Sequence, residues 1–126
     1  MHANDTNNKI IYPVLSYKIT GILFSTHNEL DRYCKEKQYQ DLFEDKLRRE
    51  KINYEREKKI LISPGICGNQ VDFCVENKIL IDFKAKKYLT KEDYYQMKRY
   101  LTAAKMKLGL VVNFRDRYLK PKRILN

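Results

Sequence analysis

The strongest constraint on the fold is a regular alternation of apolar and polar residues on both sides of a short polar turn, within residues 71–84. The apolar side chains fall on every second position: Val71, Phe73 and Val75 before the turn, and Ile79, Ile81 and Phe83 after it. A period of two is that of a strand with one buried face, so this segment is predicted to form a β-hairpin. For both apolar sets to face one core, residues 71, 73 and 75 must pair with 83, 81 and 79. Residues 76–78 then form a three-residue turn, in which Asn77 can adopt a left-handed backbone.

The same register brings two carboxylates together. Asp72 is expected directly opposite Asp82, with Cβ atoms roughly 5 Å apart, and Lys84 follows on the same face of the hairpin. Like charges so placed destabilise a sheet, and a divalent cation is the favoured way to offset them. The alternative is that these side chains form ordinary ion pairs on a solvent-exposed face.

The charge balance favours a polyanionic partner. The chain has 26 Lys and Arg against 16 Asp and Glu, a formal net charge of +10. Such an excess attracts nucleic acid first and an anionic membrane surface second, while the alternative is that it only keeps the protein soluble. A length of 126 residues predicts a single domain over residues 1–126, with a disordered lead-in at residues 1–9.

The cysteines and the hydropathy indicate a cytoplasmic protein. Cys34, Cys67 and Cys74 show neither the spacing of a zinc site nor that of a disulfide framework. No apolar run approaches the roughly 18 residues of a membrane span, and the polar start is no signal peptide.

The remaining elements follow from apolar spacing and capping signals. One helix is expected from near Val14 and a second from about Cys34 to Lys51, with one kinked helix as the alternative. The expected elements after them are an edge strand at residues 54–62, the hairpin at 69–84, a helix at 91–105 behind a Thr90–Asp93 capping box, a buried strand at 108–114 and an optional edge strand at 118–125. This order predicts an α/β fold.

The paired carboxylates indicate a particular chemistry. Mg²⁺ takes one or two carboxylates and leaves its other positions to water and to phosphate oxygens. Lys84 would stand where it can orient a water or stabilise charge developing on phosphorus. The sequence therefore indicates phosphodiester hydrolysis.

Two levels of resemblance support this interpretation. Asp72, nine intervening residues and then Asp82-Phe83-Lys84 resemble the PD-(D/E)XK nuclease signature, and the element order resembles the core of that superfamily. Over about residues 15–125 the chain is also similar to the GxxExxY proteins, a bacterial and archaeal family placed in this superfamily. The matching stretches are His27-Asn-Glu-Leu30, Glu36-Lys-Gln-Tyr39, Ile79-Leu-Ile-Asp-Phe-Lys-Ala85, Gln96-Met-Lys-Arg-Tyr-Leu101 and Leu108-Gly-Leu-Val-Val-Asn-Phe114.

The resemblance implies a restriction-endonuclease-like fold, with a mixed central sheet flanked by helices in the order α-α-β-β-β-α-β. It implies a nuclease dependent on Mg²⁺ or Mn²⁺, with DNA as the expected substrate. Glu36 would complete the metal site of Asp72 and Asp82, the Phe83 carbonyl would add a ligand, and Lys84 would position or activate the attacking water. Glu29, two helical turns before Glu36, is the alternative third carboxylate if the helix is continuous.

A helix face and a set of basic residues complete the expected site. Gln96 and Tyr100, four residues apart on one face, resemble the Gln-x-x-x-Tyr element of RecB-like members, which supports the site and contacts DNA. The alternative for Tyr100 is core packing. The expected phosphate contacts are Lys86, Lys87, Lys120, Lys122 and Arg123.

One position departs from the family pattern. The glycine that gives the family its name would fall at Tyr33, and a non-Gly residue adopts φ > 0 only at a cost, so the turn before Glu36 must differ. A nucleic-acid-binding module without turnover is therefore a second hypothesis. A subunit of a larger repair or defence complex is a third, which fits the small size of the chain. Protein partners or a homodimer are compatible with either.

Overall fold

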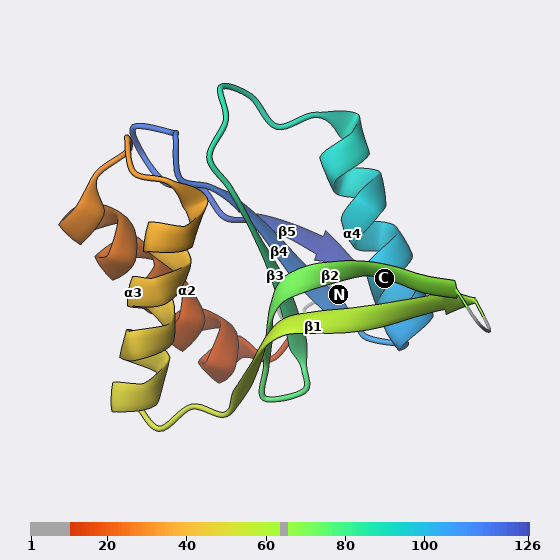
Figure 1. The fold of residues 1–126 in the computed structure, drawn as a ribbon. Helices are drawn as coiled ribbons and strands as arrows, with labels where there is room; N and C mark the ends of the chain where they lie inside the picture. Colours follow the sequence, from red (N-terminus) through yellow and green to blue (C-terminus); the bar gives the residue numbers. More distant parts are fainter. Residues whose placement is uncertain (1–10, 64–65) are drawn as a thin grey trace, which may run out of the picture.

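The structure, a computed structural model, describes residues 11–63 and 66–126. The expected lead-in at residues 1–9 and residues 64–65 lie outside the described residues. The chain forms a five-stranded mixed sheet with α2 and α3 on one face and α4 on the other (Figure 1). In chain order the elements are α2 (Pro13–Leu30), α3 (Glu36–Arg49), β1 (Tyr54–Ser63), β2 (Ile66–Val75), β3 (Ile79–Lys84), α4 (Lys91–Ala104), β4 (Leu108–Asn113) and β5 (Lys122–Leu125).

The sheet order is β1-β2-β3-β4-β5. Strand β1 lies at one edge, as the sequence predicts, and the final strand that the sequence left optional forms the other edge as β5. All neighbouring strands are antiparallel except β3 and β4, which are parallel and are joined through α4. Strand β4 is buried along its whole length, which confirms the interpretation of its continuous apolar run. Gly109 makes this packing possible, because a Cβ there would lie 2.5 Å from the Met97 sulfur of α4.

The first two helices are separate, so the alternative of one kinked helix is wrong. Helix α2 has Pro13 in its first turn and ends at Leu30, because Asp31 leaves the helical region with φ 61 and ψ −154. Helix α3 starts again at Glu36, where the Lys35 N–H donates to the Gln38 side chain at 2.9 Å. A polar side chain that accepts from a backbone N–H here stabilises a new helix start.

The hairpin of β2 and β3 has the predicted turn and register next to the turn. Val75 pairs with Ile79 and Phe73 pairs with Ile81. The turn closes through Lys78 N donating to Val75 O at 2.9 Å. Asn77 takes the expected left-handed conformation with φ 55, and Glu76 takes it as well with φ 53.

Further from the turn, the predicted pairings of Asp72 with Asp82 and of Val71 with Phe83 are wrong. The paired residues of β2 and β3 end at Phe73 and Ile81, and Val71 packs with α4 rather than with the Phe73 cluster. Strand β2 leaves β3 here to stay with β1, and the Phe83 N–H donates to the Asp72 side chain at 2.6 Å. The carboxylate of Asp72 thus becomes the acceptor at the point where the two strands diverge.

Two apolar clusters hold the layers together. The larger lies between the sheet and the α2–α3 pair, and it includes close ring contacts of Phe83 with Phe43 at 5.3 Å and with Phe114 at 4.8 Å between centroids. The smaller lies under α4 and includes Met97 and Tyr100. Because strand side chains alternate, Phe83 anchors β3 in the larger cluster while its neighbours Asp82 and Lys84 face α4.

Candidate active site

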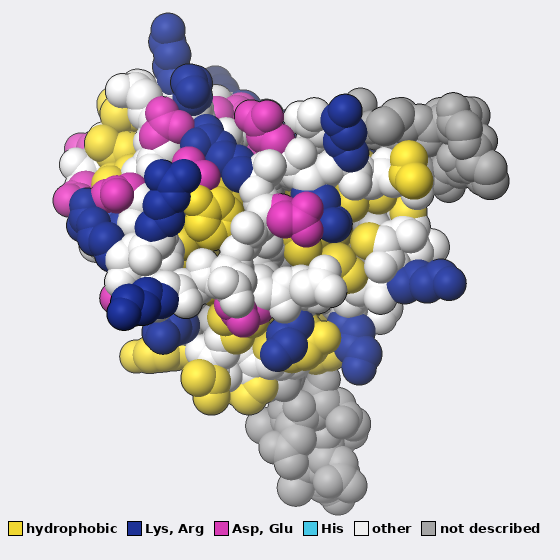
Figure 2. Space-filling model, turned by 60° about the horizontal axis from the view of Figure 1, so that its bottom comes forward, with side chains coloured by type: hydrophobic (Ala, Val, Ile, Leu, Met, Phe, Trp, Pro, Cys, Tyr) yellow, Lys and Arg dark blue, Asp and Glu magenta, His cyan; other side chains and the backbone are white. Residues whose placement is uncertain are grey.

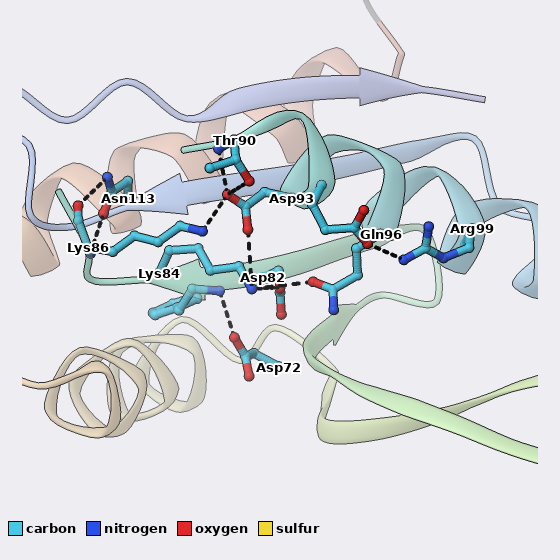
Figure 3. A network of polar contacts seen from close by, with 11 residues as sticks. Asp72, Asp82, Lys84, Lys86, Thr90, Asp93, Gln96, Arg99 and Asn113 are labelled. Atoms are coloured by element: carbon cyan, nitrogen blue, oxygen red, sulfur yellow. Dashed lines mark hydrogen bonds and ion pairs between the residues drawn. The ribbon is translucent and has the colours of Figure 1, made fainter. Parts of the chain in front are cut away.

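The candidate site lies at the carboxyl end of β3, where β2, β3 and the first turns of α4 meet (Figure 3). Asp82 and Lys84 come from β3, Asp72 from β2, and Gln96 from α4. The structure therefore brings together four of the side chains that the sequence predicts as catalytic. These residues are spread over positions 72–96, and the fold places β2, β3 and α4 close enough for their side chains to meet.

Lys84 is at the centre of this group. Its Nζ lies 3.0 Å from Asp82 Oδ2, 3.3 Å from Gln96 Oε1 and 3.9 Å from Asp93 Oδ1. Burial works against the charge of Lys84, but the neighbouring carboxylates, Asp82 foremost, outweigh it and raise the pKa of Lys84. The side chain is therefore a fixed ammonium donor at neutral pH.

Asp72 is the partner carboxylate. Its Oδ2 accepts the Phe83 N–H at 2.6 Å. Burial, and next the charge of Asp82, raise the pKa of Asp72 to about 8. Two acidic side chains that resist joint ionisation form a site that a cation would stabilise, because a positive charge removes the repulsion between them.

Glu36 stands at the first position of α3 and is exposed. Its charge is near enough to contribute to the raised pKa of Asp72. Within residues 11–63 and 66–126, however, no three His, Cys, Asp or Glu side chains are grouped closely enough to hold a metal ion. The third-carboxylate role of Glu36 stays a prediction. The alternative, Glu29, pairs with Lys46 at 2.6 Å, and the continuous helix on which it depended is absent.

The turn that aims Glu36 is held by the segment that follows β4. His27 Nε2 is bonded to Asp116 O at 2.8 Å. Arg32 and Arg115 form a reciprocal pair, in which Arg32 Nε donates to Arg115 O at 3.2 Å and Arg115 Nε donates to Arg32 O at 2.8 Å. These contacts join the orange and blue loops that lie side by side at the upper left of Figure 1.

A tyrosine braces the same turn from inside. The Tyr39 hydroxyl donates to Asp31 O and accepts from Cys34 N at 3.2 Å, while its ring stacks on Phe114 at 4.3 Å. In this turn Asp31 has a positive φ and Tyr33 does not. The turn therefore differs from one with glycine at position 33, as expected. With φ 61 and ψ −154, Asp31 has a backbone conformation that is costly for any residue except glycine, and the contacts of Tyr39 and Arg115 with this turn hold it there.

The structure adds Asp93, which the sequence indicated only as a helix cap. Asp93 is buried; its Oδ2 lies 2.6 Å from Lys86 Nζ and accepts the Thr90 N–H at 2.7 Å. Burial opposes its charge, but Lys86 and Thr90 outweigh that effect and lower the pKa of Asp93. Its position three residues before Gln96, and so on the same helix face, was the available signal.

Asn113 is a second residue that sequence reasoning missed. Its side chain is 2 % exposed and holds the backbone of Lys86 on both sides, accepting from Lys86 N at 3.1 Å and donating to Lys86 O at 2.8 Å. Asn113 pairs with Lys84 across the parallel strands, so it fixes the segment that leaves the site. No local pattern in the sequence points to this role, because it depends on the pairing of β3 with β4.

The motif geometry agrees with the comparison to known families. A family model described as PD-(D/E)XK nuclease superfamily matches residues 13–124. The chain belongs to this superfamily. The match runs from α2 into β5 and confirms the expected fold class. Searches among curated proteins and among solved structures find no match.

The residues expected to bind nucleic acid in this PD-(D/E)XK chain differ in their exposure and in their contacts. Lys86 and Lys87 adjoin Lys84, and Lys120 and Lys122 are exposed near and on β5. Arg123 is exposed but donates to Ser16 Oγ at 2.5 Å. Tyr100 is only 2 % exposed and packs in the cluster under α4, so its burial does not fit the direct contact with nucleic acid expected for it.

In the part of this superfamily member that the structure describes, no helix is both long enough and apolar enough to cross a membrane.

Proposed function

We propose that the protein is a metal-dependent nuclease that hydrolyses phosphodiester bonds, with DNA as its substrate. One observation carries the proposal: in a chain of the PD-(D/E)XK superfamily, Lys84 lies 3.0 Å from Asp82 and beside Asp72 at the carboxyl end of β3. The net charge of +10 supports a polyanionic substrate. The GxxExxY family and a cytoplasmic location belong to the same proposal.

The donor set fits Mg²⁺ or Mn²⁺. Asp72 and Asp82 offer hard carboxylate oxygens, and burial together with the charge of Asp82 raises the pKa of Asp72. Glu36 and the Phe83 carbonyl would complete the ligands. When bound, the ion would lower the pKa of a coordinated water and stabilise the charge that develops on the phosphate oxygens.

The protein side chains have separate tasks in this proposal. Lys84, kept charged by Asp82, donates to the attacking water or to a phosphate oxygen and so fixes its position. Gln96 limits the rotation of Lys84 by accepting from its Nζ. Lys86 and Lys87 lie one and two residues beyond Ala85, where they can contact the phosphates next to the cleaved bond.

A second function, binding of nucleic acid without turnover, is favoured by one observation. Glu36 is exposed, and the described residues contain no grouped set of three acidic or other metal-binding side chains. A module that had lost its third ligand would keep the basic surface and the fold. Titration calorimetry with Mg²⁺ and Mn²⁺ separates the two functions, because only the nuclease requires the metal site.

The deciding experiment compares cleavage by the parent protein, Lys84→Met and Lys37→Met. Lys37 is a matched control, because it is a lysine with 80 % side-chain exposure on α3. With Mg²⁺ or Mn²⁺, the parent and Lys37→Met are expected to cleave single-stranded, double-stranded or branched DNA. Lys84→Met is expected to be about 100-fold slower or more, since a preorganised charged donor is lost. No cleavage by the parent, or equal cleavage by Lys84→Met, contradicts the proposal.

A further inference from the structure

Helix α2 has an apolar face that the sheet does not cover. Ile19 and Leu23 are fully buried in the larger core cluster. Val14, Tyr17 and Phe24, by contrast, are 81 %, 85 % and 41 % exposed. Their spacing of three and seven residues places them in one stripe along the helix. Large side chains of this kind, gathered on one face, mark a surface that another molecule covers.

The stripe borders a groove of about 710 Å³ between α2 and the end of α3. Gly21 lines it, and a Cβ added there would meet nothing within 4 Å. Glycine inside a helix costs about 1 kcal/mol relative to alanine. Among the described residues, nothing therefore requires glycine rather than a larger residue at position 21. Its absent side chain leaves a hole on the helix surface, one turn from the exposed Tyr17 and Phe24.

The charges around the groove distinguish it from a site for nucleic acid. Its lining includes Lys18, Lys46, Arg49 and Glu50. Lys46 pairs with Glu29, and Arg49 pairs with Asp45. Two of the three cations are thus paired with carboxylates and Glu50 adds a third negative charge, in a chain whose net charge is +10. The face on which α3 runs into β1 likewise shows both signs of charge among exposed hydrophobic side chains (Figure 2).

Projecting aromatic side chains and a hole on the same helix are self-complementary. A two-fold interface needs both features in one patch, because each copy presents the same surface to the other. We propose that the groove is a homodimer interface, in which α2 of a second copy packs antiparallel across a two-fold axis near Gly21. The Gly21 positions of the two copies then face each other and let the helices approach closely, so that Tyr17 of each copy packs beside Phe24 of the other. The matched charges avoid the repulsion that two copies of a +10 chain meet elsewhere.

The interface is independent of the candidate active site. The groove is lined by residues of α2 and the end of α3, and none of Asp72, Asp82, Lys84 or Gln96 lines it. The proposal therefore does not rest on nuclease activity, and a protein without activity would still dimerise.

The test is sedimentation equilibrium of the full chain over a wide range of concentrations. The parent is expected to change from the 15.2 kDa monomer to twice that mass as concentration rises. Gly21→Gln fills the hole, so the Kd of its dimer should rise tenfold or more. The same variant should unfold at a higher temperature than the parent in dilute, monomeric samples, because Gln is a better helix former and has free space there.

Tyr17→Gln gives a second measurement that does not depend on the glycine. It should also raise the Kd tenfold or more, whereas Tyr118→Gln, a matched loss of a tyrosine with 69 % exposure, should leave the Kd unchanged. A parent that is monomeric at all concentrations overturns the proposal. So does a dimer unaffected by Gly21→Gln and Tyr17→Gln, or a monomer that uses Tyr17 to bind anionic lipid vesicles instead.

Discussion

Replacing Asp72 by Asn is expected to stabilise the protein at neutral pH when no metal is present. Asn can still accept the Phe83 N–H that Asp72 Oδ2 accepts at 2.6 Å. It carries no charge, so it removes both the burial penalty and the repulsion from Asp82, which are the two main causes of the raised pKa of Asp72. In the proposed function, the parent carries this cost because Asp72 and Asp82 would together hold a cation.

The magnitude follows from the two pKa values of Asp72, which are about 8 in the folded protein and 3.8 as the reference. Between them the unfolded chain has released its proton and the folded chain has kept it. The free energy of unfolding therefore falls as pH rises, by up to about 1.4 kcal/mol per pH unit. From pH 5 to pH 7 the parent should lose about 2 to 3 kcal/mol through this group. Below pH 3.8, the reference pKa, Asp72 is protonated in both the folded and the unfolded chain, so this loss of unfolding free energy disappears.

The assay is urea unfolding in EDTA at several pH values between 5 and 8. Asp72→Asn should show a flatter dependence on pH than the parent and should be more stable at pH 7. Glu92→Gln removes a solvent-exposed carboxylate of α4 and serves as the control, which should follow the parent. Added Mg²⁺ or Mn²⁺ should raise the stability of the parent at pH 7 but not that of Asp72→Asn, since only the intact acidic pair gains from binding.

Equal pH dependence of the parent and Asp72→Asn would refute this reasoning, because it would mean that Asp72 ionises in the folded protein as readily as in the unfolded chain. Lower stability of the variant at pH 7 in EDTA would refute it as well. In that case the carboxylate would contribute more through its hydrogen bonds than it costs through burial and repulsion.

Three further changes test the supports of the site. Asn113→Ala removes both bonds to the Lys86 backbone and should lower the free energy of unfolding by about 2 to 4 kcal/mol in urea titrations, a result that a loss below about 1 kcal/mol would contradict. Tyr39→Phe keeps the ring but loses the hydroxyl bridge in the turn, and should cost about 1 to 2 kcal/mol in the same titrations. Asp93→Asn keeps an acceptor for the Thr90 N–H but removes the ion pair with Lys86. Fluorescence anisotropy in EDTA should therefore show severalfold tighter DNA binding with a steeper salt dependence. Unchanged affinity would show that Lys86 does not contact phosphate.

The sequence predicted the parts of the fold that local patterns determine. The period-two alternation predicted the β2–β3 turn and the pairing of Phe73 with Ile81, because an error of one residue would expose the apolar side chains. The continuous apolar run predicted the buried strand β4, and the Asp82-Phe83-Lys84 motif predicted the contact of Lys84 with Asp82.

What the sequence could not predict depends on contacts between distant segments. Val71 changes sides because β2 follows β1 away from β3, and no local period records that divergence. The turn before Glu36 depends on Arg115 and Asp116, which lie more than 80 residues away. The role of Asn113 likewise appears only when β4 lies beside β3.

The parallel pairing of β3 with β4 has a consequence for the order in which the protein is made. The motif residues Asp72, Asp82 and Lys84 are synthesised well before Leu108–Asn113. Until β4 is available, β3 has an open edge and the segment after Lys84 lacks its hold from Asn113. A product that stops short of β4 therefore contains the complete motif without the scaffold that positions it. In the proposed nuclease, the motif is therefore synthesised before the scaffold that would make it active, so unfinished chains would not cleave their substrate.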